Sequence, residues 1–542
     1  MSKSITKGKS SRLTEYKAED LEYDLSDKFA GDPKAWAPIA SISNEGMMQP
    51  YEEKQIYRDN FNTEEYARVY ENEFMYAKDN PLSTFSIDVD TASYSNIRRY
   101  LTSSRMPPED SVRVEEMINY FTYAYPQPDG NDPFSITING SVCPWNKENR
   151  IVKIGIQGKK LNADELPPSN LVFLMDVSGS MNSHDKLPLL KKAFKMLVKQ
   201  LSDDERVAIV VYAGAAGMVL DSTPGSNRHM ILSAIDRLNA GGSTAGGAGI
   251  KLAYKIAKDN FIKGGNNRVI LATDGDFNIG VSSTGDLTRL IEEKREEGIA
   301  LTVLGFGTGN LKDSRMEQLA NKGNGNYYYI DTIREAKKVL VSELGSTLFT
   351  IAKDVKLQIE FNPSKVKSYR LVGYENRILA KEDFNDDTKD AGELGAGHTV
   401  TAFYEIVPAD SKEDVRKADE LIYQQTKVVT SNDVMTVKLR YKKPDEDKSK
   451  LIKKAITEED ISSVLKDDFQ FAASVAEFGL LLKNSKFKGT ATYESIIKSA
   501  ENSKGKDSFG YRNEFINLVK KAQALDYRVD TEPSKGIQFK GE

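Results

Sequence analysis

The sequence feature that most constrains the fold is the stretch 171–181, which reads LVFLMDVSGSM. Five apolar residues run without interruption into Asp176, and a polar, glycine-containing loop follows. An apolar run of this length, ended by polar and glycine residues, is typical of a strand buried on both faces of a parallel sheet. Because ligand-binding loops in such sheets lie at the carboxyl ends of the strands, we expect Asp176, Ser178 and Ser180 to share one loop at the sheet edge.

These three side chains offer one carboxylate and two hydroxyls, all hard oxygen donors. Mg²⁺ and related divalent ions prefer such donors and keep some of their water ligands. Two later stretches carry donors of the same kind: the glycine-rich loop GGST contains Thr244, and the apolar run RVILATDGD contains Asp274. Each piece alone is an ordinary turn sequence, so the metal-site hypothesis depends on all three pieces occurring in this order after the right kinds of element.

An Asp-x-Ser-x-Ser motif, then a loop threonine, then a strand-terminal Thr-Asp-Gly resembles the metal-ion-dependent adhesion site of the von Willebrand factor type A (VWA) family. The resemblance implies that five residues take the coordinating roles: Asp176, Ser178, Ser180, Thr244 and Asp274. The serines and the threonine would touch the metal directly, and the two aspartates would act mostly through bound water. The implied cofactor is Mg²⁺, or else Mn²⁺ or Ca²⁺. The alternative is a VWA fold whose site stays empty.

The block 168–349 alternates between apolar strands and amphipathic helices. This alternation predicts βαβ crossovers and an α/β fold with a doubly wound, mostly parallel sheet and helices on both faces. The order of elements matches a VWA domain throughout. The expected strands are 171–175, 207–212, 269–272, 300–305 and 327–330, and the expected helices are 186–201, 227–238, 249–261, 287–297, 315–321 and 334–344.

The stretches on either side of this block are rich in alternating strands. We expect a flexible leader at 1–60 and an N-terminal flanking region at 61–165 that holds a helix at 62–76 plus strands. The block 168–349 is expected to be inserted into one β-rich domain, in which 352–445 pairs with 80–165. The charged runs 381–390, 410–420 and 442–460 are interpreted as solvated loops, and 446–542 as a charged linker followed by C-terminal helices.

Two further aspartates, Asp88 and Asp90, alternate with apolar residues in a predicted strand. Two carboxylates on one polar strand face could indicate a second metal site. A solvated strand face is the favoured interpretation, because alternation of this kind is typical of a half-buried strand.

Several segments of the flanks resemble one bacterial family of VWA proteins that has its own N-terminal region and a C-terminal domain of unknown function. The segments are PLSTFSIDVDTASYSNIRR, VRVEEMINYFTYAYP, NNRVILATDGDFNIG, DVKLQIEFNP, GYENR and GAGHTVTAFYEI. The resemblance covers about residues 60–525. It implies a location at the cell envelope, because members of the family often carry a signal peptide or a lipoprotein cysteine. Neither is recognised in this sequence, so the localisation is left open.

Composition excludes some classes of function. Lys and Arg number 75 against 80 Asp and Glu, and this net charge of −5 argues against a nucleic-acid-binding surface. No stretch approaches ~18 uninterrupted apolar residues, so we predict no transmembrane helix. Cys143 is the only cysteine, which rules out an intrachain disulfide, and it is expected to be a buried structural thiol.

The predicted function follows from the resemblance. In VWA adhesion sites a carboxylate from an Asp or Glu of a partner protein completes the coordination of the metal, which implies a metal-dependent protein-binding module and no enzymatic activity. A hydrolase is the weaker alternative. It would need a base such as His184, Asp185 or Asp276, and no paired His/Asp arrangement or P-loop lysine accompanies them. A VWA scaffold with no ligand is the third alternative.

Overall fold

The predicted strand at 171–175 is the centre of a six-stranded sheet. The structure is a computed structural model that describes residues 63–87, 90–161, 165–213, 215–242, 246–275, 284–389, 391–413, 422, 427–444, 446–462 and 467–526. All eight residues of β5 (Ser169–Asp176) are buried. The strand order is β10-β9-β8-β5-β6-β7, with β10 (Tyr327–Ile330), β9 (Ile299–Phe306), β8 (Asn266–Thr273), β6 (Arg206–Ala213) and β7 (Ala215–Pro224).

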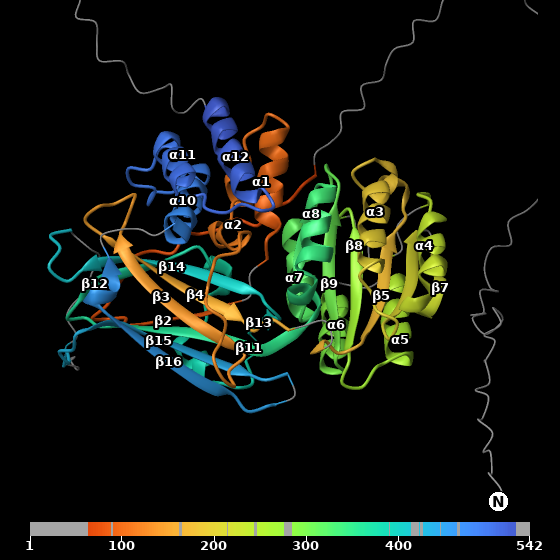
Figure 1. Ribbon diagram of the computed structural model, residues 1–542, viewed down its shortest axis with the longest axis horizontal. Coiled ribbons are helices and arrows are strands. Elements are labelled where there is room, and N and C mark those ends of the chain that lie inside the picture. The colour runs from red at the N-terminus through yellow and green to blue at the C-terminus, as the bar shows by residue number, and fades with distance from the viewer. Residues whose placement is uncertain are drawn as a thin grey trace, which may run out of the picture. The chain divides into compact units, whose positions relative to one another are not determined.

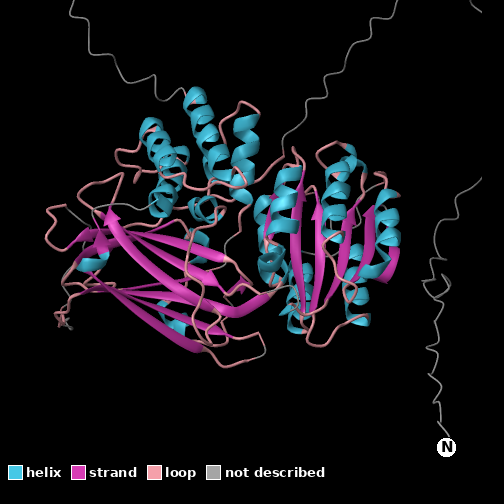
Figure 2. Ribbon diagram, viewed as in Figure 1, coloured by secondary structure: helices cyan, strands magenta, loops and turns pink. Residues whose placement is uncertain are grey.

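Neighbouring strands of this sheet are parallel, except that β7 runs antiparallel to β6 at one edge. Helices cover both faces, because parallel strands need crossover connections. On one face α3 (Leu187–Val198), α4 (Arg228–Asp236) and α8 (Ile333–Lys337) share a core with Phe173 and Met175. On the other face α5 (Gly246–Asp259), α6 (Thr284–Glu296) and α7 (Asp313–Lys322) share a core with Val172 and Leu174 (Figure 2). The predicted doubly wound α/β fold is therefore confirmed.

Two further sheets pack face to face across a third apolar core (Figure 1). The first has the order β1 (Met75–Tyr76), β12 (Val366–Val372), β14 (Thr399–Pro408), β4 (Arg150–Gly158), β3 (Phe134–Val142) and β17 (Ile461–Ser462). The second has β13 (Gly392–Gly395), β11 (Thr350–Phe361), β15 (Asp433–Lys442) and β16 (Lys450–Thr457), with β2 (Leu82–Ser86) also paired to β11. The pairs β4–β14 and β2–β11 join strands that precede the six-stranded sheet to strands that follow it.

A helical cluster covers the outer face of β14. It contains α1 (Ala92–Thr102), α2 (Val114–Asn119), α10 (Asp467–Leu482), α11 (Tyr493–Asn502) and α12 (Tyr511–Leu525). Helix α10 is apolar nearly all round and is buried accordingly. Cys143 lies in this core, fully buried as predicted, and burial raises the pKa of its thiol. Among the described helices, none combines the length and the hydropathy needed to cross a membrane.

The predicted helix at 62–76 is wrong in the described part of that range. The backbone N–H groups of Thr63 and Glu65 donate to the carbonyls of Gly309 and Leu311, at 2.8 and 3.0 Å, and β1 pairs with β12. The aromatic and apolar residues at helical spacing do not face one core, since Tyr70 is 73% exposed. Hydrogen-bond partners on distant segments therefore satisfy this backbone in an extended form.

The charged run at 442–460 is not wholly a solvated loop, because it contains β16, which pairs with β15 along its length. Lys453 and Lys454 are exposed on this edge strand, and Lys454 also donates its ammonium to the carbonyl of Ile136 at 2.8 Å. Lysines on an exposed edge oppose pairing with a second molecule, so the charge that suggested a loop suits an edge strand as well.

The interpretation of Asp90 as part of a solvated strand face is also wrong. Asp90 is 1% exposed, accepts a hydrogen bond from the backbone N–H of Tyr327 at 2.7 Å, and forms an ion pair with Arg377 at 3.2 Å. The carboxylate therefore ties the N-terminal flank to the edge of the six-stranded sheet. Its companion Asp88 lies outside the described residues.

Buried ion pairs attach the flanking helices to the domain of the six-stranded sheet. Arg98 of α1 contacts Asp331 at 2.5 Å and Glu335 at 2.7 Å. Arg113, at the start of α2, reaches the amino-terminal half of α7, where it contacts Asp313 at 3.0 Å and Glu317 at 3.1 Å. Guanidinium groups form such paired contacts with directional geometry, and breaking one partner leaves an uncompensated buried charge. The attachment of the two parts therefore depends on specific charges as well as on apolar packing.

Candidate metal site

The predicted metal-site residues lie at the carboxyl ends of two neighbouring strands. β5 ends at Asp176, and β8 ends at Thr273, directly before Asp274. The two strands are parallel and in register, with Met175 beside Ala272, so both ends reach the same edge of the sheet. Asp176 and Asp274 are each 0% exposed. Their carboxylates are therefore held by strand ends in a setting largely shielded from water.

The serine loop turns its hydroxyls toward one another. The backbone N–H of Ser178 donates to Oδ1 of Asp176 at 2.8 Å, and the hydroxyl oxygens of Ser178 and Ser180 lie 3.0 Å apart. Thr273 donates its hydroxyl to Oδ2 of Asp176 at 3.4 Å. Ser178 is buried, whereas Ser180 is exposed. Hard oxygen atoms thus converge at a point that solvent can reach on one side, an arrangement that fits a partly hydrated divalent ion.

The glycine-rich loop lies against the serine loop. The N–H of Gly241 donates to the carbonyl of Val177 at 2.7 Å, and the N–H of Gly179 donates to the carbonyl of Gly242 at 3.1 Å. These two bonds hold residues 241 and 242 beside the serines. Thr244, the fifth predicted ligand, lies outside the described residues, as does the candidate base Asp276.

The two carboxylates have opposite pKa shifts. The pKa of Asp176 is raised to about 6, chiefly by burial and also by the charge of Asp274, although hydrogen bonds from Ser178 oppose the shift. Burial would raise the pKa of Asp274 as well, but the ammonium of Lys186 lowers it overall. Two buried carboxylates beside one buried ammonium leave an excess of negative charge. The donor chemistry and the charge therefore both fit an added cation.

Lys186 is a site residue that the sequence analysis missed. Its Nζ donates to Oδ2 of Asp274 at 2.8 Å and to Oδ1 of Asn310 at 3.2 Å. The aliphatic part of the Lys186 side chain packs against Gly307, which has φ +73°. A Cβ at that glycine would lie 2.3 Å from the Cγ and Cε atoms of the lysine, so a larger residue would clash with it. The lysine is the residue before α3. A cation at a helix N-terminus opposes the helix dipole, and this was the one sequence signal of a special role.

Two of the three residues proposed as a hydrolase base, His184 and Asp185, lie in the described part of the chain, and neither is paired with the serines of the candidate metal site. His184 is exposed, and Asp185 accepts a hydrogen bond from the hydroxyl of Ser183. Among the described residues, neither hydrogen-bonds to the hydroxyl of Ser178 or Ser180. Across all the residues that the structure describes, no group of three or more His, Cys, Asp or Glu side chains is placed to bind a metal. A site here would therefore be of the hydroxyl-rich kind.

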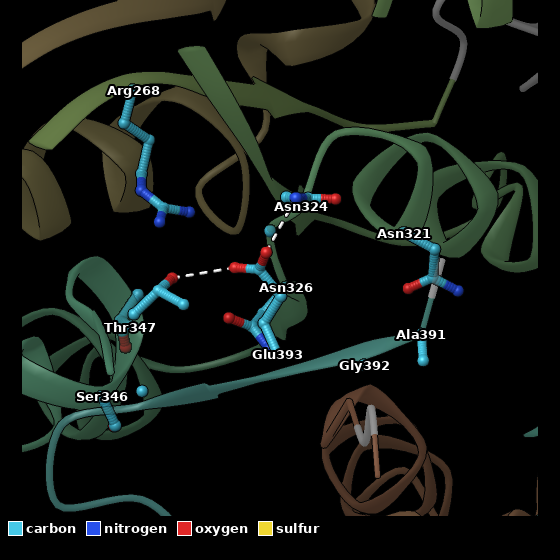
Figure 3. Close-up of a pocket in the computed structure, with 12 residues that line it drawn as sticks. Arg268, Asn321, Asn324, Asn326, Ser346, Thr347, Ala391, Gly392 and Glu393 are labelled. Carbon is cyan, nitrogen blue, oxygen red and sulfur yellow. Dashed lines mark hydrogen bonds between the residues drawn. The ribbon is translucent and has the colours of Figure 1, made fainter. Parts of the chain in front are cut away.

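A separate small cavity lies at the opposite end of β8 (Figure 3), lined by Arg268 at the start of that strand and by Glu393 of β13. Arg268 is 3% exposed and donates to the hydroxyl of Thr302 at 2.8 Å. Glu393 accepts from the amide of Asn324 at 2.7 Å and the hydroxyl of Thr350 at 2.8 Å. The cavity volume is about 30 Å³, which holds water but no organic ligand. We therefore assign this cavity to the packing of the two domains.

Three family models match consecutive parts of the chain. A model described as von Willebrand factor matches residues 60–153, one described as von Willebrand factor type A domain matches 170–341, and one described as uncharacterized protein YfbK, C-terminal, matches 346–525. The three matches thus follow the order of N-terminal flank, six-stranded sheet and C-terminal flank.

Comparison with individual proteins gives one likeness that spans most of the chain and others that are partial or remote. Uncharacterized protein YfbK of Escherichia coli (strain K12) is 41% identical over 483 residues, which cover 87% of this chain and 83% of that protein. Uncharacterized protein sll0103 of Synechocystis is 30% identical over 193 residues, which cover 34% of this chain and 43% of that protein. A solved von Willebrand factor type A structure from Catenulispora acidiphila covers 74% of this chain and 98% of that chain, with 15% identity and a TM-score of 0.41. Because the likeness to YfbK spans both flanks and the central domain, this chain belongs to the YfbK family of bacterial VWA-domain proteins.

Proposed function

We propose that this protein is a metal-dependent protein-binding module, in which a divalent ion held by the serine loop takes a carboxylate from a partner protein. A VWA domain supports a role in protein interaction in general. The observation that carries the finer proposal is the open cluster at the carboxyl ends of β5 and β8. In this cluster Asp176 and Asp274 are fully buried, and Ser180 of the adjoining serine loop is exposed to solvent. The proposed ion is Mg²⁺, with Mn²⁺ and Ca²⁺ as the alternatives.

The chemistry of the donor set supports a carboxylate-bearing partner. Hydroxyl groups are neutral ligands, so an ion bound to Ser178 and Ser180 would keep most of its charge. A carboxylate from an Asp or Glu of the partner would neutralise that charge in a partly desolvated loop, where the attraction is stronger than in water. We propose no catalytic step, because His184 is exposed and Asp185 is engaged by Ser183.

Calorimetric titration of MgCl₂ and MnCl₂ into EDTA-stripped full-length protein tests the metal site. Asp176→Ala should abolish saturable binding. Asp236→Ala, which changes a carboxylate that is 57% exposed on the same domain, should leave binding unchanged. The melting temperature of Asp176→Ala in metal-free buffer should stay close to wild type, because the desolvation cost of this buried carboxylate offsets the hydrogen bonds that it accepts from Ser178 and Thr273. Absence of binding by the wild type would contradict the proposal and leave the VWA domain as a scaffold.

A pull-down with and without EDTA tests the partner. A protein captured by the wild type, lost with EDTA and lost with Asp176→Ala would support carboxylate-mediated binding. Capture that EDTA does not reduce would mean that the partner binds a surface other than the metal site. A role at the cell envelope is part of the proposal by family resemblance, and it predicts that the native protein cofractionates with membranes. Recovery in the cytosolic fraction alone would contradict that part.

A further inference from the structure

The proposed metal site already contains a positive charge of its own. The ammonium of Lys186 lies 2.8 Å from Asp274, and the side chains of the pair are 10% and 0% exposed. A divalent ion bound at the serine loop would bring a second cation close to this lysine. In a site shielded from water, two cations sharing one carboxylate repel each other strongly. Binding of the ion therefore favours a position of Lys186 away from Asp274.

The lysine has a second partner, and that partner lies on the loop 307–312. Asn310 accepts from Lys186 at 3.2 Å. The same loop presses against the residue that follows Asp274: Gly275 has φ +108°, and a Cβ there would lie 2.5 Å from the carbonyl oxygen of Asn310. A shift of Lys186 or of the Asp274 turn is therefore transmitted to the loop by direct contact, because close-packed atoms cannot absorb it.

The other side of this loop holds residues 63–66, which we call the N-terminal arm. The backbone N–H of Gly309 donates to Oε1 of Glu64 at 2.8 Å, and Thr63 donates its backbone N–H to the carbonyl of Gly309. The carboxylate of Glu64 is also held by Arg99 at 2.7 Å and by the hydroxyl of Tyr100 at 2.7 Å. Although burial opposes ionisation, Arg99 and these hydrogen bonds lower the pKa of Glu64 to about 2. The arm is thus anchored to the loop through one buried carboxylate.

We propose that occupancy of the metal site and docking of the N-terminal arm are negatively coupled, with Lys186 and the loop 307–312 as the link. This inference rests on the proposed metal site and adds a regulatory input to it. In the arrangement described, Lys186 bridges Asp274 and Asn310 and holds the loop in the position that receives Glu64. When a divalent ion binds, Lys186 leaves Asp274 and the loop loses this anchor. By thermodynamic reciprocity, release of the arm then strengthens metal binding to the same extent.

Calorimetric titration of MgCl₂ into full-length variants tests the coupling. Glu64→Gln should tighten Mg²⁺ binding roughly fivefold or more, the usual lower bound for coupled sites. Glu65→Gln is the matched control. The carboxylate of Glu65, which follows Glu64 in the chain, is 66% exposed and lies 3.8 Å from the ammonium of Lys312. Lys186→Met should also tighten binding, and the double variant Glu64→Gln, Lys186→Met should bind no more tightly than Lys186→Met alone.

Hydrogen exchange of the wild type provides a readout that does not depend on any variant folding. Saturating MgCl₂ should speed exchange of the backbone N–H groups of Thr63, Glu65 and Gly309. Unchanged exchange, or a Glu64→Gln variant with the affinity of wild type, would overturn the coupling while leaving the metal site intact. Additive effects of the two substitutions would overturn the assigned role of Lys186. Failure of the wild type to bind Mg²⁺ would overturn the proposed function and the coupling together.

Discussion

Glu477 offers a quantitative test of how burial controls the stability of this protein. It lies on α10, is 3% exposed, and has no ion pair or hydrogen bond among the described residues. Burial alone raises the pKa of its carboxyl from the ordinary 4.5 to about 7. A single cause acts on a single group, so the effect on stability can be worked out directly.

The raised pKa means that the folded state favours the protonated form of Glu477. Below about pH 4.5 the group is protonated in both states, and its burial carries no ionisation penalty. Between pH 4.5 and 7 the unfolded state loses the proton while the folded state keeps it, so stability falls as the pH rises. Above pH 7 the full penalty applies. The difference between about 7 and 4.5, at about 1.36 kcal/mol for each pH unit, corresponds to about 3 kcal/mol.

Glu477→Gln keeps the shape of the side chain and removes the titration. We expect the variant to match wild type near pH 4.5 and to be more stable by about 3 kcal/mol near pH 8. Urea unfolding at a series of pH values measures this, and the fluorescence of Trp145 reports on the same helical core. Glu501→Gln is the control, because that carboxylate is half exposed and paired with Lys520. A difference between variant and wild type that does not change with pH would refute the reasoning.

Two further predictions follow from buried groups elsewhere. Arg98→Met should lower the free energy of unfolding by about 3–5 kcal/mol, because it leaves the buried carboxylates of Asp331 and Glu335 without their ion-pair partner. The control Arg289→Met, at an ion pair whose side chains are 73% and 55% exposed, should lower it by less than about 1 kcal/mol. Equal effects of the two substitutions in chemical denaturation would contradict this account. Cys143 should resist alkylation in the native protein at pH 8, because it is buried and burial raises the pKa of its thiol. It should react once the protein is unfolded in urea, and mass spectrometry measures the labelling. Rapid labelling of the folded chain would show instead that the thiol is accessible.

The central sheet could be predicted because its signals are local. An apolar run such as 171–175 has to be buried on both faces, and the alternation with amphipathic helices fixes a parallel arrangement. The position of Asp176 and Asp274 at one sheet edge follows from the same logic, since strands that run parallel end on the same side. The antiparallel edge strand β7 was not expected, because residues 215–224 lack a comparable apolar run.

Two of the three wrong predictions arose where distant partners decide the local structure. Residues 63–74 have aromatic residues at helical spacing, yet their backbone hydrogen bonds go in part to the loop near Gly309. The lysines of β16 resemble a solvated linker, although β15 supplies the ladder that makes them a strand. Asp90 appeared to face solvent until Arg377, far along the chain, was brought to it. For residues 63–74 and for Asp90 the deciding group lies far away in sequence, so no local pattern can report it. The β15–β16 hairpin is local, and there the charged residues concealed the strand.

The sequence by itself therefore determined the doubly wound sheet, its helices and the edge at which the serine loop and Asp274 meet, because hydrophobic periodicity and strand direction are properties of short segments. Only the tertiary structure decided the charge balance of that edge. Lys186 reaches Asp274, Asn310 joins the lysine to a loop, and Glu64 reaches the same loop from a segment that precedes the domain. Electrostatic contacts of this kind depend on which side chains the finished fold brings within a few ångströms, and sequence spacing does not record that distance.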